Sequence, residues 1–245
     1  MAPQYSQNKD AAKRLFRELI FSPNLAMLFV MNEKSGTVYD RCLINRLTGT
    51  VNGNPTYSKD IGNFWGLDFD GTGDYVDLGN ATSLDFERTE AFSGLCVIDP
   101  NISTQVSILG KYTLTGVDRG WEWFCTAARL PSLVLSSAAG NRIEVNANAA
   151  IANGTDRMLA FSYSGSSAAS GVILYDNGAA VADTDTEDTL SATMVNTSTN
   201  AYIGAQHTTP PTFLMNGDIG FVALWDGRAL SAVEMRRFAY LGGFL

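Results

Sequence analysis

The chain begins with helical periodicity and then changes to strand periodicity for most of its length. Between residues 8 and 20, apolar side chains recur every three or four positions, which predicts an amphipathic helix capped by Asn8 and stopped by Pro23. The apolar positions are Ala11, Ala12, Leu15, Phe16, Leu19 and Ile20. Near the other end, Ser231 and Glu234 have the spacing of a capping box, which predicts a second short helix.

Between the helices, short apolar or alternating stretches are separated by turn residues, as is typical of antiparallel strands. In "GLDFDGTGDYVDLGN" (66–80), apolar and polar residues alternate on both sides of a glycine-rich centre. This pattern predicts a β-hairpin in which residues 75–78 pair with residues 67–69. The alternative, an EF-hand calcium loop, fails because its twelfth position is Gly79 where that loop needs Glu.

Two stretches in the second half add to this pattern. Asn177-Gly178 predicts a tight hairpin, whereas "DTDTED" (183–188) is expected to be a solvated acidic loop, with metal ligation as its alternative. Many short strands with helices only at the ends favour a sandwich over alternating strands and helices. We therefore predict a helical segment over residues 1–23, followed by one β-sandwich over residues 24–245.

Composition and charge exclude several classes of protein. Hydrophobic residues make up 45% of the chain, but no run of 18 apolar residues is present, so no membrane insertion is expected. The net charge is −8, which disfavours nucleic acid and anionic membranes as partners. The three cysteines lack metal or disulfide spacing and are expected to be reduced and buried. The N-terminus has no apolar region behind a basic one, so no signal peptide is predicted.

A series of motifs occurs in a characteristic order over about residues 24–238. They are "LAMLFVMNEKSGTVYDR", "LDFDGTGDYVDLG", "SLDF", "LYDNG" and "FLMNGDIGFVALWDGRALSAVEM". This order resembles the laminin-G-like, concanavalin-A-like jelly-roll family. The resemblance implies two curved antiparallel sheets whose concave face and loops often bind glycans or protein surfaces. We therefore expect an all-β, two-sheet antiparallel jelly-roll sandwich with a short helix at each end.

The resemblance also implies one structural calcium site. Some relatives hold calcium between an Asp of a late strand and main-chain carbonyl groups of an early hairpin. Asp218 stands at the first place in this chain, and Asp70 and Gly71 at the second. Calcium takes six to eight oxygen ligands, of which these groups supply several. The alternative is that Asp218 only caps the end of a strand.

Enzymatic chemistry is not predicted. Hydrolases of the resembled fold carry a Glu-x-Asp-x-x-Glu string, which supplies their paired carboxylates, and this string is absent. Glu122 stands alone in "WEWF", and Glu144 pairs only with Arg142 on its face of the strand. His207 is the single histidine, in a loop rich in turn formers, and no nucleophile elbow or P-loop occurs.

Trp121 and Trp123 flank Glu122, so that both indole rings lie on one face of their strand. Aromatic rings stack on the apolar faces of sugars, which makes this pair a candidate glycan-binding platform. The alternative is that both rings fill the core of the sandwich.

The N-terminal helix lies outside the resembled family. Its apolar side chains, together with its basic residues in an otherwise acidic protein, suggest a particle anchor. The anchor residues are Arg14, Leu15, Phe16, Arg17, Leu19 and Ile20. The alternative is that the helix folds back onto its own sandwich.

A fold usually met outside cells, without an export signal or disulfides, suggests a virus particle, which assembles in the host cytoplasm and is released by lysis. The leading hypothesis is a non-enzymatic virion surface protein that decorates a bacteriophage capsid or tail. It would form a homo-oligomer on the particle, contact capsid or tail proteins, and bind host or environmental glycans. The alternatives are a free carbohydrate-binding module and a glycan hydrolase.

Overall fold

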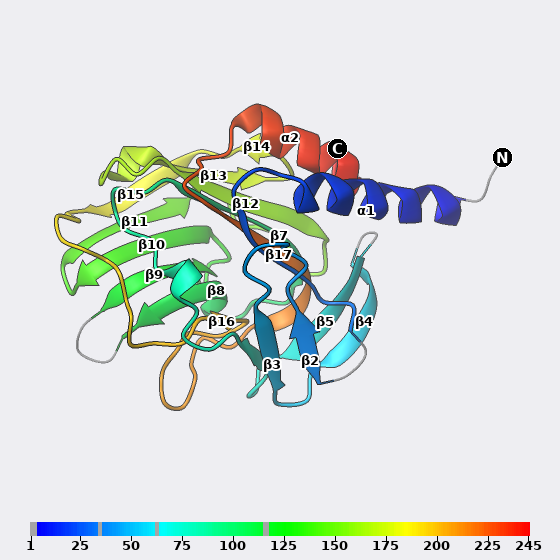
Figure 1. Ribbon diagram of the computed structural model, residues 1–245, viewed down its shortest axis with the longest axis horizontal. Coiled ribbons are helices and arrows are strands. Elements are labelled where there is room, and N and C mark those ends of the chain that lie inside the picture. The colour runs from blue at the N-terminus through cyan, green and yellow to red at the C-terminus, as the bar shows by residue number, and fades with distance from the viewer. Residues whose placement is uncertain (1–3, 34–35, 62–63, 115–117) are drawn as a thin grey trace.

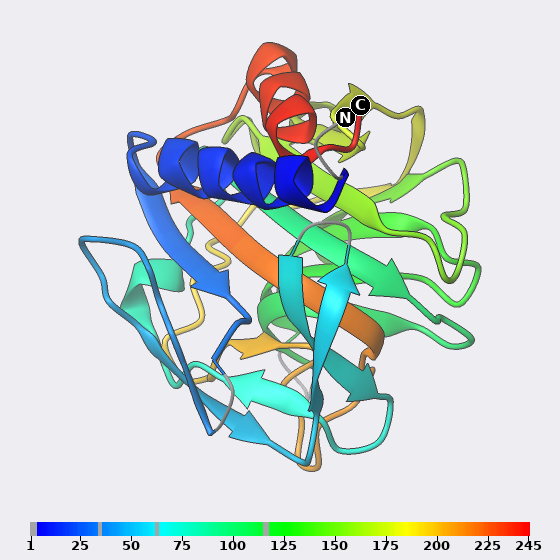
Figure 2. The ribbon, with the colours of Figure 1, turned by 90° about the vertical axis from the view of Figure 1, so that its right-hand side faces the viewer.

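The computed structural model describes residues 4–33, 36–61, 64–114 and 118–245. In these residues two antiparallel sheets pack face to face, which confirms the predicted jelly-roll sandwich with a helix at each end (Figure 1). Both helices lie on one side of the molecule, over the outer face of one sheet (Figures 1 and 2). Neither described helix is long and apolar enough to cross a membrane.

The sheet beneath the helices has eight described strands in the order β14–β13–β12–β7–β17–β5–β4, with β1 also paired to β17. Its strands are β1 (Leu25–Val30), β4 (Thr56–Ile61), β5 (Phe64–Asp70), β7 (Phe92–Pro100), β12 (Arg157–Tyr163), β13 (Val172–Asp176), β14 (Ala179–Ala180) and β17 (Asn216–Asp226). We call it the eight-stranded sheet.

The opposite sheet has nine described strands in the order β15–β11–β10–β9–β8–β16–β6–β3–β2. They are β2 (Thr37–Tyr39), β3 (Thr48–Asn52), β6 (Tyr75–Asp77), β8 (Val106–Thr113), β9 (Arg119–Cys125), β10 (Pro131–Ala138), β11 (Asn141–Ala147), β15 (Asp183–Asp188) and β16 (Tyr202–Ile203). We call it the nine-stranded sheet. Short 3-10 turns occur at Thr82–Leu84 and Ala169–Gly171.

The central strands of the eight-stranded sheet, β1, β7, β12 and β17, are buried on both faces. Along β17, Val222 and Leu224 point into the core between the sheets, whereas Phe221 and Trp225 point to the helices. Strands buried on both faces have no polar side, which explains continuous apolar runs such as "LAMLFV" in β1. Neither described helix covers the outer face of the nine-stranded sheet, where β11 alternates between buried and half-buried residues, while β8, β9 and β10 are buried at most positions.

Helix α1 (Gln4–Ile20) folds back onto the eight-stranded sheet and lies beside α2 (Ala232–Gly242). It begins four residues before the predicted start, so Asn8 lies inside the helix and is not its N-cap. The capping box predicted for α2 is present, with Ser231 and Glu234 bonded reciprocally.

The apolar side of α1 packs against the eight-stranded sheet of the same chain. Leu15 and Leu19 are fully buried, and Phe16 packs edge-on against Phe64 and Phe221 with ring centroids 5.3 and 5.5 Å apart. Ile20 packs against the same cluster. These four side chains therefore cannot form the predicted particle anchor, because their own sheet covers them, and the fold-back alternative is confirmed. The remaining two anchor residues, Arg14 and Arg17, are exposed.

The predicted hairpin over residues 66–80 is wrong in its pairing. β5 belongs to the eight-stranded sheet, whereas β6 lies between β3 and β16 of the other sheet, so the intervening turn carries the chain from one sheet to the other. The buried carboxylate of Asp74 holds this corner by accepting the backbone N–H groups of Asn54 (2.7 Å) and Asp70 (3.2 Å). Alternation predicts strands on both sides of a turn but does not say which strands pair.

The acidic stretch 183–188 is a strand and not the predicted loop. β15 pairs with β11 at the edge of the nine-stranded sheet, where mostly exposed acidic side chains oppose pairing with another chain. The hairpin at Asn177 and Gly178 is confirmed, with φ of 49° and 75° at the two turn residues. The three cysteines are buried and unbridged, as predicted.

Because Leu19 is fully buried between α1 and the sheet, Leu19→Ala should lower the free energy of unfolding by about 2–5 kcal/mol through a lost contact and a residual cavity. Arg14→Ala on the exposed side of the same helix should change it by no more than about 0.5 kcal/mol. Urea unfolding followed by tryptophan fluorescence measures both. Equal, small effects in the two variants would show that α1 does not pack on the sheet in solution.

Candidate functional site

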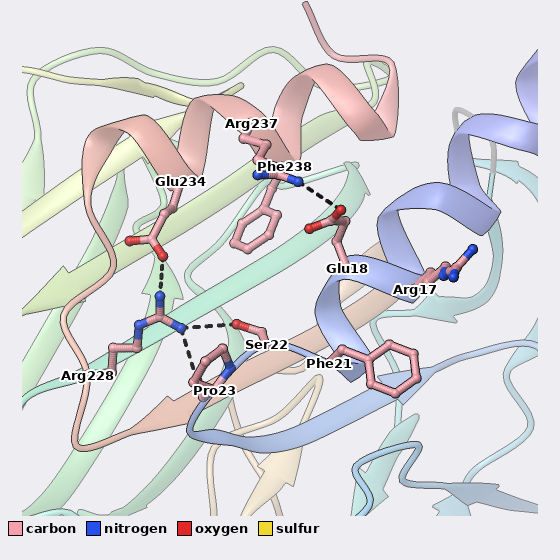
Figure 3. Close-up of a pocket in the computed structure, with 9 residues that line it drawn as sticks. All are labelled: Arg17, Glu18, Phe21, Ser22, Pro23, Arg228, Glu234, Arg237 and Phe238. Atoms are coloured by element: carbon pink, nitrogen blue, oxygen red, sulfur yellow. Dashed lines mark hydrogen bonds and ion pairs between the residues drawn. The ribbon is translucent and has the colours of Figure 1, made fainter.

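Two hollows on the surface are large enough to consider as sites. The first lies between α1 and α2 (Figure 3). It is lined by Arg17, Glu18, Phe21, Ser22, Pro23, Arg228, Glu234, Arg237 and Phe238.

The polar groups in this first hollow bind one another. Arg237 forms an ion pair with Glu18 at 2.8 Å, and Arg228 pairs with Glu234 while also donating to the Pro23 carbonyl at 3.0 Å (Figure 3). The Arg237–Glu18 pair joins the two helices, and Arg228 links the start of α2 to the segment that follows α1. Most of the charged groups in this hollow are therefore engaged in structural contacts.

The second hollow lies on the outer face of the nine-stranded sheet and has a volume of about 330 Å³. We call it the outer-face pocket. This volume is within the range of small-molecule sites, roughly 300–1,000 Å³. Its lining residues come from β8, β9, β10, β11 and neighbouring loops: Gln105, Tyr112, Leu114, Glu122, Phe124, Thr126, Val134, Arg142, Glu144, Gln206 and Phe213.

The pleat of β9 decides which of its residues face this pocket. Glu122 and Phe124 point outward, whereas Trp121 and Trp123 point into the core and are 1% and 0% exposed. The Trp123 ring packs edge-on against Phe161 at 5.1 Å. The predicted glycan platform at the two tryptophans is therefore wrong, because neither ring can contact a ligand. The alternative, that both rings fill the core, is confirmed.

Glu122 forms the floor of the pocket and is only 2% exposed. Its neighbour on β8 is Gly110, where a Cβ atom would lie 3.1 Å from the Glu122 side chain, so the absence of a side chain leaves room for the carboxylate. The Gln206 amide nitrogen donates to Glu122 Oε2. Among the residues that the structure describes, neither Glu122 Oε1 nor Gln206 Oε1 has a hydrogen-bond partner. When Glu122 is ionised, the floor thus presents two buried oxygen acceptors.

Burial makes Glu122 a perturbed acid. Removal from water raises its pKa to about 7, against the opposing effect of Ser107 and Gln206, which favour the ionised form. The Ser107 hydroxyl lies beside the carboxylate without the geometry of a hydrogen bond. The charge on nearby Glu144 raises the pKa further. A buried acid with a pKa this far from its ordinary value marks the pocket as a candidate functional site.

One wall of the pocket carries an ion-pair network. Arg142 on β11 binds Glu144 at 3.2 Å and Glu187 of β15 at 2.5 Å. The single positive charge is shared by two carboxylates, so this wall is acidic overall.

Much of the remaining lining of the pocket is apolar. Tyr112, Phe124 and Val134 form a small buried cluster separate from the core, and Leu114 and Phe213 extend it. Buried acceptors beside an apolar surface suit a ligand that has both hydroxyl groups and apolar faces.

The two acids of the pocket do not have the spacing of a retaining glycoside hydrolase. A retaining hydrolase needs two carboxylates about 5–5.5 Å apart. Glu144 lies on β11, with β10 between it and Glu122, so the two Cβ atoms are roughly 9.5 Å apart from strand spacing alone. Arg142 also holds the Glu144 carboxylate. His207 does not line the pocket, since its ring bonds to Thr199 at 2.6 Å.

Sequence analysis found part of this pocket and missed the rest. It identified Glu122 as an isolated acid and the Arg142–Glu144 pair, but treated them separately. Gln206 is 84 residues from Glu122 along the chain, and no local pattern links the two. The available signal was the alternation of "WEWF", which also places Phe124 on the same face as Glu122.

The pairing of β17 with β5 places the predicted calcium ligands on neighbouring strands, with Asp218 not directly opposite Asp70. On β17, Asp218 is opposite Asp68 of β5, and Asn216 is opposite Asp70. The Asp70 carboxylate accepts the Thr72 backbone N–H at 2.6 Å. Within the described ranges, no three His, Cys, Asp or Glu side chains form a metal-binding group. Calcium binding by Asp218 and the hairpin at Asp70 and Gly71, which relies on main-chain carbonyl groups, stays a prediction.

Comparison with solved structures places the fold among known sandwiches. The binding domain of Paraclostridial Mosquitocidal Protein 1 matches with a TM-score of 0.61 and 12% identity, over 88% of this chain and 52% of that chain. The Trypanosoma rangeli sialidase in complex with sialic acid matches with a TM-score of 0.63 and 12% identity, over 95% and 38%. The Ruminococcus gnavus IT-sialidase CBM40 bound to α2,3 sialyllactose matches with a TM-score of 0.50 and 16% identity, over 62% and 83%.

At these identities the similarities establish the fold alone. This chain spans about half of the toxin binding domain and less than two fifths of the sialidase. No protein-family model matches the sequence, and no curated protein matches it.

The raised pKa of Glu122 predicts a specific dependence of stability on pH. The native protein holds this proton up to about pH 7, whereas the unfolded chain releases it near 4.5. Stability should therefore fall as pH rises from about 4.5 to 7, by roughly 3 kcal/mol from this group. Glu122→Gln should remove that loss, so that the variant gains stability relative to the parent over this window.

Glu144→Gln is the matched control, since it removes the same charge from a half-exposed position in the same pocket. It should keep most of the pH dependence. Urea unfolding at several pH values measures all three proteins. A parallel pH profile for the parent and Glu122→Gln would show that Glu122 is not a buried, perturbed acid.

The calcium prediction has a direct test in thermal unfolding. A bound ion would raise the melting temperature by mass action, and chelation would lower it. Asp218→Asn should then abolish the shift, because it removes the predicted carboxylate ligand. Identical melting curves with calcium and with chelator, for protein shown afterwards to be free of metal, would contradict the prediction of a bound calcium ion.

Proposed function

We propose that this chain is a non-catalytic carbohydrate-binding domain and that the outer-face pocket holds the glycan. The observation that carries the proposal is the pair of buried acceptor oxygens on Glu122 and Gln206 beside the apolar surface of Phe124 and Val134. A saccharide has groups that complement both the acceptor oxygens and the apolar side chains. Its hydroxyl groups donate to the acceptors, and the C–H face of its ring packs on the apolar side chains.

The fold comparisons support this class of function without assigning a ligand. Two of the similar structures are named as binding domains or modules, the mosquitocidal protein binding domain and the CBM40. This support favours the free carbohydrate-binding module over the virion protein among the hypotheses drawn from the sequence.

The absence of catalysis is part of the proposal. The pocket has one buried acid, and the next carboxylate is bound to Arg142 two strands away. A sialidase is among the similar structures, so hydrolysis of saccharides is the alternative activity to be tested.

The placement on a bacteriophage particle stays a prediction from the sequence. Capsid or tail partners, assembly of several copies, and location in a virion rest on expectations drawn from the sequence. The apolar side of α1 packs on its own sheet, so a particle contact would have to use another surface.

If the pocket holds a glycan, a saccharide identified on a glycan array should bind in solution, and Phe124→Ala and Gln206→Ala should each weaken it. The expected loss is about tenfold or more for each, from lost packing or a lost hydrogen bond. Titration calorimetry measures the dissociation constants, with circular dichroism to confirm folding.

Trp65→Ala is the control, because this tryptophan is 47% exposed on β5 of the other sheet. It should bind normally. Binding that survives both pocket variants but is lost with Trp65→Ala would place the site elsewhere. Binding of no saccharide at all would contradict the proposed function.

The same saccharides should be left intact by the protein. Reducing ends released above background, and abolished by Glu122→Gln, would show that the pocket is catalytic. Release that persists in this variant would indicate a contaminating enzyme, since Glu122 is the buried acid of the pocket.

A further inference from the structure

We infer that the outer-face pocket selects uncharged saccharides and rejects acidic ones, including sialylated glycans. The inference rests on the proposed function and names the ligand class of the same site. It follows from two features of the pocket. Its floor has hydrogen-bond acceptors without partners among the described residues, and its one positive charge is already paired with carboxylates.

When Glu122 is ionised, the floor of the pocket requires a ligand that donates hydrogen bonds. Glu122 Oε1 and Gln206 Oε1 are both acceptors, and both belong to side chains at least 97% buried, with 2% and 3% exposed. A sugar hydroxyl donates a proton to either oxygen. A carboxylate or sulfate group has no proton to donate, so it would place its own oxygens against those of the floor at a cost in desolvation and repulsion.

The wall of the pocket offers an anion little attraction. Arg142 is the cation among the lining residues, and two carboxylates already neutralise it, Glu144 at 3.2 Å and Glu187 at 2.5 Å. To bind an anion, Arg142 would have to give up at least one of these pairs. The whole chain, with a net charge of −8, adds a weaker repulsion of the same sign.

The charge pattern therefore points away from the ligands seen in some proteins of similar fold. Sialic acid and sialyllactose occupy the T. rangeli sialidase and the R. gnavus CBM40. Both ligands carry a carboxylate, which a site for them must neutralise. In the outer-face pocket, the carboxylates of Glu144 and Glu187 instead neutralise Arg142.

The test compares neutral saccharides with acidic partners of the same core: lactose with α2,3-sialyllactose, galactobiose with digalacturonate, and cellobiose with cellobiuronic acid. Titration is done at low ionic strength and at about pH 8, where Glu122 is ionised. For each neutral sugar that binds through the pocket, its acidic partner should bind at least about tenfold more weakly. Sensitivity to Phe124→Ala shows that binding uses the pocket.

Glu187→Gln should reduce the ratio of the acidic to the neutral sugar's dissociation constant by about threefold or more, because it frees part of the Arg142 charge for an anion. Asp68→Asn changes the net charge equally on an exposed position of β5. It should leave the ratio unchanged, which separates a local effect from overall charge. Circular dichroism and urea unfolding verify that both variants fold.

The outcomes separate the two proposals. Acidic partners that bind as well as neutral ones, and depend on Phe124, would overturn this inference and leave the proposed function standing. An unchanged ratio in Glu187→Gln, or the same change in Asp68→Asn, would also overturn it. If no saccharide binds in a way that depends on Phe124, the proposed function fails and this inference fails with it.

Discussion

The pleat of β9 is the constraint from which both the core and the pocket follow. Side chains alternate across a strand, so the choice that buries Trp121 and Trp123 also places Glu122 and Phe124 on the outer face. The two tryptophans pack against aromatic residues of the opposite sheet and fix this orientation. A shift of one residue in β9 would put the carboxylate in the core. The pocket is therefore held in place by the largest buried side chains of the sandwich.

Cover by the two helices decides which face of the sandwich remains for a ligand. α1 and α2 cover the outer face of the central strands of the eight-stranded sheet, and the ion pair of Arg237 with Glu18 joins the two helices (Figure 3). The nine-stranded sheet keeps an outer face with open surface, and the pocket lies there. The N-terminal helix thus contributes to function indirectly, by completing the fold. Its apolar side packs against the eight-stranded sheet.

Buried charges in this protein fall into two kinds. Lys111 is 1% exposed, yet its ammonium group donates to Asp85 at 2.6 Å and to the Ala81 carbonyl at 2.9 Å. Asp40 accepts three backbone N–H groups. Such fully bonded charges stabilise a fold. Glu122 has one bonded oxygen and one without a partner among the described residues, at a cost in stability that is expected at functional sites.

The sequence by itself determined the class of fold, because periodicity and turn chemistry are local. The capping box at Ser231, the hairpin at Asn177 and the alternation of β9 all depend on residues a few positions apart. The order of motifs, read as a resemblance, added the two-sheet architecture. The same alternation also implies that Glu122 and Phe124 share one side of their strand, although the sequence analysis did not draw that consequence.

Only the tertiary structure decided which side of β9 is the core, because alternation is symmetric and both sides carry aromatic rings. It also decided that residues 66–80 cross between sheets, since pairing depends on strands that are distant in the chain. Gln206 joins Glu122 across 84 positions, and Glu187 reaches Arg142 from an edge strand whose acidic sequence suggests a loop. A binding site built from several strands depends on these long-range pairings, which the chain acquires only when the sheets form.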